Sequence, residues 1–315
     1  MALPAYSVVI PTWNGRELVD RLVRSLLESG FSSDAELIVV DDGSDDGTAE
    51  HIATTFCTAR VIRHEKNRGF GAACNTGIVA SQGQIVILLN NDLVVYPNFA
   101  DALLGHFQDQ RVFAVNPQVF QMDGQSPGGG LVRGYWHGGL LRLRWSDSAQ
   151  QRSQSAFTLY ANGAACALNR EKFITLGGFD SLYEPFYSED LDLSYRAWQR
   201  GWEVRYEPGS KVMHAHGATI KSTHTSSFIE CVSTRNRILF VWRNLRDPFL
   251  LLEHIGWLLL RTLGAGLTGN ILFFKALHAA LRKLPQVRSR RSTDRDITVS
   301  DRAILARSSE WAQSK

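Results

Sequence analysis

The chain is poor in cysteine, and the few cysteines it has form no recognisable framework. Four occur in 315 residues, far apart and without the close spacing of a metal site: Cys57, Cys74, Cys166 and Cys231. Small proteins held together by disulfides carry cysteine at a much higher density. We therefore expect four reduced thiols in a reducing compartment.

A large excess of charge of one sign is also missing. The formal net charge is only +3, which disfavours a dedicated nucleic-acid-binding protein, so we expect no nucleic acid among its partners. Residues 1–7 contain neither a basic segment nor a long apolar run, and we predict no secretion signal and a cytoplasmic catalytic part. The hydrophobic fraction of 44% is ordinary and allows a large core in one or two domains.

Two phosphate-binding motifs are absent. No Gly-x-Gly-x-x-Gly follows the first predicted strand, and the chain has no Gly-x-x-x-x-Gly-Lys loop. These glycine-rich loops bring backbone N–H groups close to phosphates in dinucleotide-dependent dehydrogenases and in P-loop enzymes. Their absence disfavours both classes.

One apolar run is present that organises the rest of the chain. Residues 85–89 are continuously apolar and end abruptly at Asn90, Asn91 and Asp92, which predicts a strand buried on both faces and followed by a polar turn. Ligands of open α/β sheets bind at the carboxyl ends of strands. Asp92 offers hard oxygen atoms, which suit Mg²⁺ or Mn²⁺ on a phosphate. The alternative is a plain polar turn.

Three more strands, alternating with amphipathic helices, are predicted before this run, at residues 6–10, 36–40 and 60–63. That alternation predicts a parallel sheet with right-handed crossovers. Polar residues follow the strands, and all lie on one edge of such a sheet: Thr12, Asn14, Asp41, Asp42, Asn67, Arg68, Asn90, Asn91 and Asp92. Their concentration predicts a site. We expect Pro11 to end the first strand and Asn14 to cap the following helix.

The middle of the chain has an unusual composition. Residues 121–155 are rich in glycine and carry a basic and aromatic run without clear periodicity, so we predict either a mobile loop over the site or a plain surface insertion. Residues 158–168 predict a strand with small side chains that allow close approach of a ligand or a backbone.

An acidic helix start and a pair of histidines complete the candidates. We expect Ser188 to cap a helix with Glu189 and Asp190 in its first turn, where they either complement the helix dipole or supply a general base. A predicted strand then leads to His214 and His216, which are candidates for contact with a metal or a phosphate.

The C-terminal part turns apolar and then basic. A helix is predicted over residues 226–245, and apolar segments begin at Pro248. A membrane-spanning helix needs about 20 apolar residues, whereas the uncharged run covers only residues 262–274. The basic residues that follow favour an in-plane anchor on an anionic lipid surface over residues 248–291. The alternative is a buried helical hairpin that packs on the catalytic domain or on a second subunit.

In this order the motifs resemble glycosyltransferase family 2, and most closely its bacterial rhamnosyltransferase-like branch. The resemblance covers residues 6–217 and rests on these motifs: Val8-Val9-Ile10-Pro11-Thr12-Trp13-Asn14-Gly15, Val40-Asp41-Asp42-Gly43-Ser44, Asn67-Arg68-Gly69-Phe70-Gly71, Leu89-Asn90-Asn91-Asp92, Gly177-Gly178-Phe179-Asp180 and Glu189-Asp190-Leu191-Asp192. The branch also tends to carry an Arg-Asn pair such as Arg235-Asn236.

The fold class that the resemblance implies is α/β. It is the GT-A fold of nucleotide-diphospho-sugar transferases, with a mostly parallel Rossmann-like sheet flanked by helices and a C-terminal helical membrane-associating extension. We predict a catalytic domain at residues 1–225, with a nucleotide-binding half (1–118) and an acceptor and catalytic half (119–225). Apolar and basic helices follow over residues 226–288, and a disordered polar tail over residues 289–315.

The resemblance also implies roles for single residues. It implies contacts with the nucleotide sugar from Pro11, Thr12, Asn14, Asp41, Asp42, Asn67, Arg68, Gly71, Asn90 and Asn91. It implies that Asp92, with His214, binds a divalent cation, Mg²⁺ or Mn²⁺, and that Asp190, beside Glu189, is the catalytic base. The family often has Asp at the position of Asn90, and this neutral amide leaves strict cation dependence open.

The implied reaction transfers a sugar with inversion. Asp190 takes a proton from an acceptor hydroxyl, which attacks the anomeric carbon of a nucleoside-diphosphate sugar, and the diphosphate leaves from the opposite face. The expected acceptor is a cell-surface polysaccharide or a polyprenyl-linked oligosaccharide. The enzyme would be cytoplasmic and peripheral on the inner face of the cell membrane.

Two other functions stay open. A non-catalytic membrane-bound scaffold of a polysaccharide assembly complex would keep the fold, although the carboxylates of Asp42, Asp92 and Asp190 are all present. A sugar-phosphate nucleotidyltransferase would carry a glycine-rich basic loop after its first strand, where this chain has Thr12-Trp13-Asn14-Gly15. A homodimer is open as well.

Overall fold

The structure is a computed structural model, which describes residues 6–32, 34–146, 148–215, 224–294 and 296–309. One large mixed sheet forms its centre, with the strand order β10-β12-β6-β11-β4-β1-β2-β3, while β5 pairs with β12 and β7 pairs with β6. A separate hairpin consists of β8 and β9. His216 lies outside the described residues.

The strands of the large sheet are β1 (Ser7–Thr12), β2 (Glu36–Asp41), β3 (Ala59–Arg63), β4 (Ile85–Leu89), β5 (Leu93–Val95), β6 (Val112–Phe120), β7 (Pro127–Gly129), β10 (Ala156–Phe157), β11 (Ala165–Asn169) and β12 (Glu203–His214). The hairpin strands are β8 (Val132–His137) and β9 (Leu140–Trp145). The helices are α1 (Arg16–Glu28), α2 (Thr48–Thr55), α3 (Phe70–Ala80), α4 (Phe99–Leu104), α5 (Ala149–Arg152), α6 (Arg170–Thr175), α7 (Glu189–Gln199), α9 (Ser226–Asn244), α10 (Pro248–Thr268), α11 (Ile271–Arg282), α12 (Leu284–Thr293) and α13 (Asp301–Ser309). Two 3₁₀ turns are η1 (Gly105–Gln108) and η2 (Ser181–Tyr183).

The first four strands form the parallel sheet that the sequence predicts. β3, β2, β1 and β4 run parallel in that order, so their carboxyl ends lie on one edge. The second half is mixed, because β11 is antiparallel to both β4 and β6, while β12 is parallel to β6. The polar ends of the four parallel strands therefore meet, as expected.

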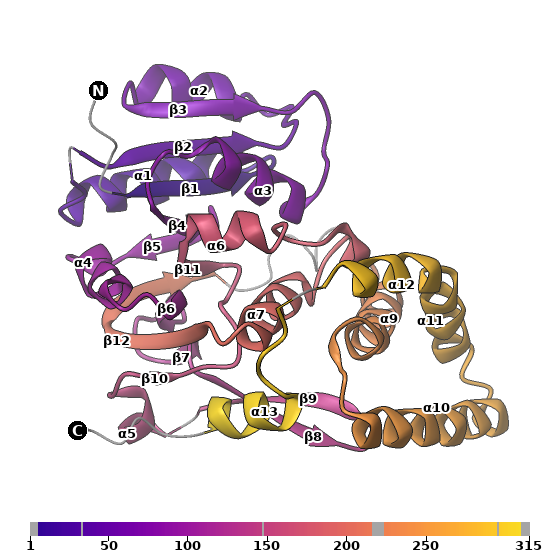
Figure 1. Ribbon diagram of the computed structural model, residues 1–315. Coiled ribbons are helices and arrows are strands. Elements are labelled where there is room, and N and C mark those ends of the chain that lie inside the picture. Colours follow the sequence, from indigo (N-terminus) through magenta and orange to yellow (C-terminus); the bar gives the residue numbers. More distant parts are fainter. Residues whose placement is uncertain (1–5, 33, 147, 216–223, 295, 310–315) are drawn as a thin grey trace.

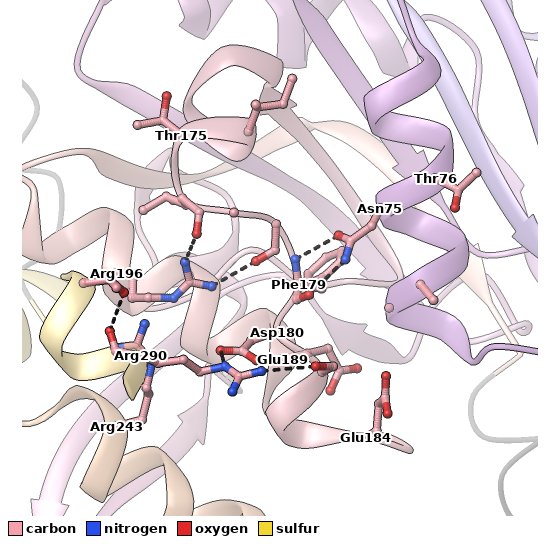
Figure 2. Close-up of a pocket in the computed structure, with 18 of the residues that line it drawn as sticks. Asn75, Thr76, Thr175, Phe179, Asp180, Glu184, Glu189, Arg196, Arg243 and Arg290 are labelled. Atoms are coloured by element: carbon pink, nitrogen blue, oxygen red, sulfur yellow. Dashed lines mark hydrogen bonds and ion pairs between the residues drawn. The ribbon is translucent and has the colours of Figure 1, made fainter. Parts of the chain in front are cut away.

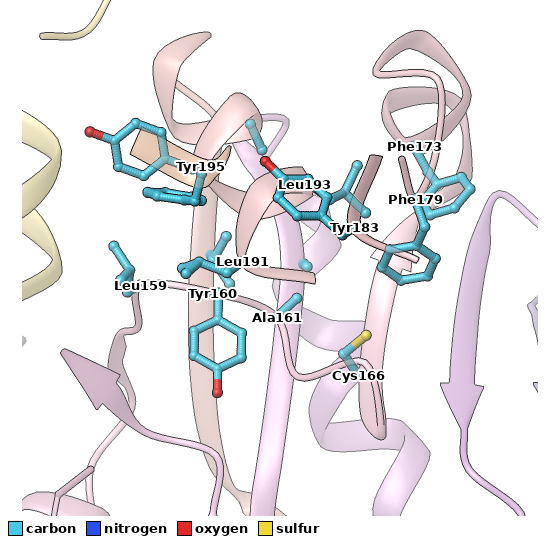
Figure 3. Packing of buried hydrophobic residues seen from close by; sticks show 14 of the residues in the cluster. Leu159, Tyr160, Ala161, Cys166, Phe173, Phe179, Tyr183, Leu191, Leu193 and Tyr195 are labelled. Atoms are coloured by element: carbon cyan, nitrogen blue, oxygen red, sulfur yellow. The ribbon is translucent and has the colours of Figure 1, made fainter. Parts of the chain in front are cut away.

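Alternate residues of each strand enter two cores, one on each face of the sheet. In β4, Val86 and Leu88 belong to one core and Ile87 and Leu89 to the other, which explains its unbroken apolar run. Burying such a side chain contributes about 1.5–3 kcal/mol. Figure 3 shows the first core beside α7, where Phe173 packs edge-on against the ring of Phe179.

The segment at residues 121–155, for which the sequence left a mobile loop or a surface insertion open, contains three strands and a short helix. β8 and β9 pair in register from Val132↔Trp145 to His137↔Leu140. Gly138 and Gly139 connect them with φ angles of 57° and 69°, which matches a two-residue turn that needs positive φ at both positions. These glycines interrupt the alternation of apolar and polar residues, so the sequence pattern does not show the two strands.

The predicted disordered tail at residues 289–315 is ordered where the structure describes it. α12 continues to Thr293, and α13 packs against α7 and the hairpin. The carboxylate of Asp301 is buried and accepts hydrogen bonds from the hydroxyl of Tyr195 (2.7 Å) and the backbone N–H of Asp247 (2.7 Å). Tertiary polar contacts stabilise this segment, and its composition alone does not show them.

Several predicted boundaries also change. Residues 158–164 form a loop, and only β11 (Ala165–Asn169) of the strand predicted at 158–168 is a strand. The strand predicted before His214 is part of one long strand, β12, which has an irregularity between Glu207 and Lys211.

Two predicted caps and one strand end are corrected as well. Pro11 lies inside β1 rather than ending it. Gly15 occupies the N-cap of α1, and Asn14 precedes it with a φ of 47°. Ser188 does occupy the N-cap of α7, but its φ is 78° and its side chain accepts no capping hydrogen bond.

The C-terminal helices α9–α12 form a group beside the sheet (Figure 1). α11 and α12 both pack on α9, whereas α10 begins next to the β8–β9 hairpin and projects away from the sheet. The uncharged run at residues 262–274 is divided between α10 and α11, because Gly269 and Asn270 separate the two helices. Among the described residues, α10 is the one helix that is long and apolar enough to cross a membrane, and only 11% of it is buried.

Candidate active site

The ends of β1 and β4 touch through side chains. Nδ2 of Asn91 donates a hydrogen bond of 2.8 Å to Oγ1 of Thr12. Gly15 closes the same turn, because an added Cβ there would lie 2.3 Å from Nδ2 of Asn91. The backbone can approach this pair only without a side chain at that position. Pro11 and Thr12 are buried at this edge.

The turn after β2 is connected to the turn after β1. Asp41 is fully buried, and its Oδ1 accepts a hydrogen bond of 3.0 Å from the backbone N–H of Ser44. The backbone N–H of Asn14 donates to Oγ of Ser44 (2.9 Å), and Oδ1 of Asn14 accepts from the backbone N–H of Asp45 (3.0 Å). Asp41 and Asn14 therefore shape these two turns.

Asp42 holds the turn that precedes α3. Its Oδ2 accepts hydrogen bonds from the backbone N–H groups of Arg68 (3.0 Å) and Gly69 (2.8 Å). Oδ1 of Asn67 also accepts from Gly69 (3.0 Å). On the other side, Nδ1 of His64 lies 2.6 Å from Oδ1 of Asp42. The sequence analysis missed His64, although it follows β3 directly and so shares the signal of the other strand ends.

The predicted metal ligands lie side by side. Nε2 of His214, at the end of β12, is 3.1 Å from Oδ1 of Asp92, and both side chains are largely buried. Oδ1 of the neighbouring Asn90 is buried and has no hydrogen-bond partner among the described residues. Mg²⁺ and similar cations are often held by one or two carboxylates together with water and substrate phosphates. These oxygen atoms fit a divalent cation, although the described part of the chain holds no group of three or more His, Cys, Asp and Glu ligands.

A short loop connects Asp190 to this edge of the sheet. The backbone N–H of Gly163 donates to Oδ2 of Asp190 (3.3 Å), and the carbonyl of Ala164 accepts from the backbone N–H of Asn90 (2.7 Å). A second N–H, that of Leu191, donates to Oδ1 of Asp190 (2.8 Å). Burial raises the pKa of Asp190 above its ordinary value, and these hydrogen bonds oppose the shift.

Hydrogen bonds from Asn116 of β6 hold the loop at residues 158–164. Nδ2 of Asn116 donates to the carbonyl of Tyr160 (2.9 Å), and its Oδ1 accepts from the backbone N–H of Asn162 (2.9 Å). Asn116 is fully buried. It therefore fixes the position of the Gly163 N–H that contacts Asp190.

The two acids beside Asp190 differ in role. Oε2 of Glu189 is buried without a hydrogen-bond partner among the described residues, and burial with the charge of Asp190 raises the pKa of Glu189 to about 8. Asp192 instead pairs with Arg196 at 2.7 Å. Burial alone would raise the pKa of Asp192, but the charges of Arg196 and Arg243 hold it below its usual range. Asp192 is therefore a structural ion-pair partner.

Helix α9 holds the turn that leads into α7. The side-chain amide of Asn236 donates to the carbonyls of Tyr183 (2.8 Å), Phe186 (2.9 Å) and Tyr187 (2.8 Å). Arg235 donates to the same turn at the carbonyl of Glu184. The Arg235-Asn236 pair thus positions the start of α7, where Glu189 and Asp190 lie.

A cavity of about 660 Å³ lies beside the start of α7 (Figure 2). Of the predicted site residues, Arg68, Gly71 and Glu189 line it, whereas the strand-end group around Asp92 does not. Its volume is typical of small-ligand pockets. The structure therefore divides the predicted residues between this cavity and the edge of the sheet, and the loop at residues 162–164 joins the two.

Taken together, the sheet order and the acidic edge define an α/β fold of the nucleotide-binding class with a carboxylate held beside the site. The family follows from sequence comparison. The family model "Glycosyl transferase family 2" matches residues 7–177, and the chain belongs to this family.

Two relatives illustrate the match. A pre-mycofactocin glycosyltransferase of Mycobacterium tuberculosis is 32% identical over 226 residues, which cover 68% of this chain and 43% of the relative. An N-acetylglucosaminyl-diphospho-decaprenol L-rhamnosyltransferase of the same organism is 28% identical over 234 residues, which cover 66% of this chain and 75% of the relative. The match thus spans less than half the length of the first relative.

Two solved structures share the fold. The crystal structure of GalNAc-T7 with UDP, GalNAc and Mn²⁺ has a TM-score of 0.64 and 23% identity, over 78% of this chain and 49% of that one. The mannosyltransferase PcManGT from Pyrobaculum calidifontis, in complex with GDP-Man and Mn²⁺, has a TM-score of 0.53 and 17% identity, over 90% and 88%. These likenesses confirm the predicted GT-A fold.

Proposed function

We propose that this chain is an inverting glycosyltransferase that moves a sugar from a nucleoside-diphosphate sugar to a hydroxyl of a lipid-linked or cell-surface glycan. One observation carries the proposal within the structure: residues 163 and 164 join the carboxylate of Asp190 to Asn90 by two hydrogen bonds. In this proposal Asp190, whose pKa is raised by burial, acts as the base next to the predicted diphosphate site. Family membership supports the same chemistry.

Each part of the site has a task in this proposal. The turns held by Asp41 and Asp42 bind the nucleoside, with Thr12 and Asn91 at the floor. The guanidinium of Arg68 makes no ion pair or hydrogen bond among the described residues. Arg68 lines the cavity beside α7 and would contact the donor phosphates. Asp190 accepts the proton of the acceptor hydroxyl, and a positioned base accelerates such a step about 10²–10⁴-fold.

Asp92 and His214 would hold the divalent cation, with Asn90 in place of a second carboxylate. Such an ion, when bound, offsets the charge that grows on the leaving diphosphate. The two structural neighbours carry Mn²⁺ together with a nucleotide or nucleotide sugar, which supports a cation here. We expect weaker cation binding than at a site with two carboxylates.

The acceptor is proposed to be carried on a lipid. The rhamnosyltransferase relative is named for an N-acetylglucosaminyl-diphospho-decaprenol acceptor. In this chain, α10 exposes a stripe of apolar side chains at helical spacing: Phe249, Leu252, Ile255, Leu259, Leu260, Leu263 and Leu267. Such a stripe, followed by basic residues in α11 and α12, suits the surface of an anionic membrane. We place the protein at the inner face of the cell membrane.

The experiment is nucleoside diphosphate release from a panel of nucleotide sugars, with membrane lipid extract as acceptor and with or without Mg²⁺ or Mn²⁺. The proposal predicts release that needs one donor, the extract and Asp190. Release that continues after chelation would keep the transferase and remove the cation role of Asp92. A folded protein that binds nucleotide but releases none with any donor would favour the scaffold.

A further inference from the structure

A second cavity lies on the C-terminal side of the molecule, away from the predicted site residues. Its volume is about 300 Å³. Four elements line it: β9 of the hairpin, α9, α10 and the start of α11. None of the predicted catalytic, nucleotide or metal residues contributes to its wall.

Three arginines from three different elements line this cavity: Arg142 of β9, Arg237 of α9 and Arg261 of α10. Among the described residues, the guanidinium of Arg261 lies 5.8 Å from the ring of Phe273, and none of the three guanidiniums forms an ion pair or hydrogen bond. One acid, Glu230, lies in the wall and is exposed. Partial burial and the neighbouring charge of Arg142 lower the pKa of Arg237, so the two cations repel each other.

The first cavity provides a contrast. It also contains arginines, but Arg196 pairs with Asp192 (2.7 Å) and Arg290 pairs with Asp180 (2.7 Å). Those guanidiniums have structural partners within the chain. The three arginines of the second cavity share their wall with one acid, the exposed Glu230, so positive charge is in excess there. Holding like charges together is unfavourable unless an anion joins them.

The wall of the second cavity is partly aromatic, and hydrogen bonds join one of its helices to the hairpin. Trp257 of α10 stacks on His254, whose Nδ1 lies 2.7 Å from the carbonyl of Gly139 in the hairpin turn. Glu253 receives hydrogen bonds from Trp136 (2.8 Å) and from the backbone of Gly139 (3.1 Å). These contacts join α10 to β8 and to the hairpin turn, next to the cavity that Arg142 and Arg261 line.

The position of the cavity indicates where its ligand comes from. Trp257 and Arg261 line it from the same helix that exposes the apolar stripe on α10. An anion bound here would be held by the same helix that carries the apolar stripe, so a lipid that contacts α10 is a suitable source for it. On α9, Arg237 follows Asn236, which holds the turn before α7.

We propose that the second cavity binds the phosphate or diphosphate group of a lipid, through the guanidiniums of Arg142, Arg237 and Arg261. This inference rests on the proposed transfer to a lipid-linked acceptor. It adds a binding site for the phosphate group that connects the lipid to the sugar. Arginine suits this task because its planar guanidinium forms paired hydrogen bonds to phosphate oxygens. Glu230, which is exposed, lies at the edge of this cavity.

The test measures binding without any donor, so that its failure is separate from a failure of sugar transfer. The probe is an isoprenyl diphosphate in phosphatidylcholine vesicles, compared with phosphatidylglycerol vesicles, with inorganic diphosphate as competitor. The double variant Arg142→Gln, Arg237→Gln is expected to lose at least about tenfold in affinity, because charged hydrogen bonds are removed. Inorganic diphosphate should compete for the unchanged protein.

A matched control removes the same charge elsewhere. Arg21 and Arg24 of α1 are exposed and lie outside both the cavity and the basic C-terminal helices, so Arg21→Gln, Arg24→Gln should change the affinity by less than about threefold. If the double variant does not fold, the single variant Arg261→Gln, which changes an exposed residue of the cavity, replaces it and should also lose affinity. If the cavity variants lose affinity for vesicles with isoprenyl diphosphate, the ligand is a lipid-linked diphosphate. If they lose affinity only for phosphatidylglycerol vesicles, the ligand is the phosphate of a bulk phospholipid. Equal affinities of cavity variants and control in both vesicle types would overturn the proposal.

Discussion

At the scale of residues, the start of α7 places three acids in three electrostatic settings within four positions. Asp192 is neutralised by Arg196, Asp190 is held by backbone N–H groups, and Glu189 has no partner among the described residues for one of its oxygens. The sequence shows only the acidic run. The pairing of Asp192 with Arg196 is one helical turn apart and can be expected from sequence. The contact of Asp190 with Gly163 spans 27 residues and cannot.

The buried carboxyl of Glu189 predicts a dependence of stability on pH. Its pKa rises from 4.5 to about 8 on folding, because burial and Asp190 disfavour its charge. A raised folded pKa means that the stabilising protonated form is fully present below pH 4.5 and is lost as the pH rises to about 8. The free energy of unfolding should fall there by about 1 kcal/mol per pH unit.

Glu189→Gln should remove that slope. Denaturant unfolding between pH 5 and pH 9 measures it, with Glu17→Gln, which changes an exposed acid on α1, as the control. An unchanged slope in the Glu189 variant would mean that another group titrates in this range.

At the scale of elements, sequence predicts best where one interaction dominates. The run at residues 85–89 and the helix of residues 16–28 follow from hydrophobic pattern alone, and both are present. The four polar strand ends follow from the parallel sheet. The β8–β9 hairpin does not, because Gly134 and the Gly138-Gly139 turn interrupt its alternation. Ser188 occupies the N-cap of α7 as predicted, but its side chain accepts no capping hydrogen bond. The turn before α7 is held instead by the side-chain amide of Asn236.

The hairpin turn is predicted to support α10. Gly139 has a φ of 69°, and an added Cβ would lie 2.4 Å from Cβ of Trp257. Gly139→Ala should therefore cost about 1–3 kcal/mol in free energy of unfolding, from backbone strain and from the displaced helix.

Gly266→Ala is the matched control, because Gly266 lies inside α10 and an added Cβ meets nothing within 4 Å. It should stabilise the helix by about 0.5–1 kcal/mol. Thermal unfolding followed by circular dichroism compares the two. Equal stability of both variants would show that the hairpin does not support α10.

At the scale of the whole molecule, a GT-A domain is joined to a helical group that reaches away from it (Figure 1). α9 belongs to both parts, since it packs with α11 and α12 and also holds the turn before Asp190. The sequence predicts the apolar and basic character of this end. It does not predict the ordered polar tail, whose Asp294 pairs with Arg246 (2.7 Å) and also with Arg243.

Removing the exposed stripe of α10 should weaken membrane binding without unfolding the protein. Leu260, Leu263 and Leu267 are 73%, 67% and 90% exposed, so their replacement by Gln removes apolar surface that touches solvent. Vesicle binding should fall about tenfold or more, because a side chain of this size contributes about 1.5–3 kcal/mol when fully buried. A sedimentation assay with phosphatidylglycerol vesicles measures this. Binding equal to that of the unchanged protein would mean that α10 packs on another protein surface.

The central claim is that Asp190 acts as the base of sugar transfer. The most direct test is the single-turnover transfer rate of Asp190→Asn. The control is Asp34→Asn, which changes an exposed acid before the amino end of β2, whereas the site lies at the carboxyl ends of the strands. The account predicts a rate about 10²–10⁴-fold lower for the Asp190 variant, with nucleotide affinity nearly unchanged and normal transfer by the control. Transfer by Asp190→Asn at the rate of the unchanged protein would contradict the account.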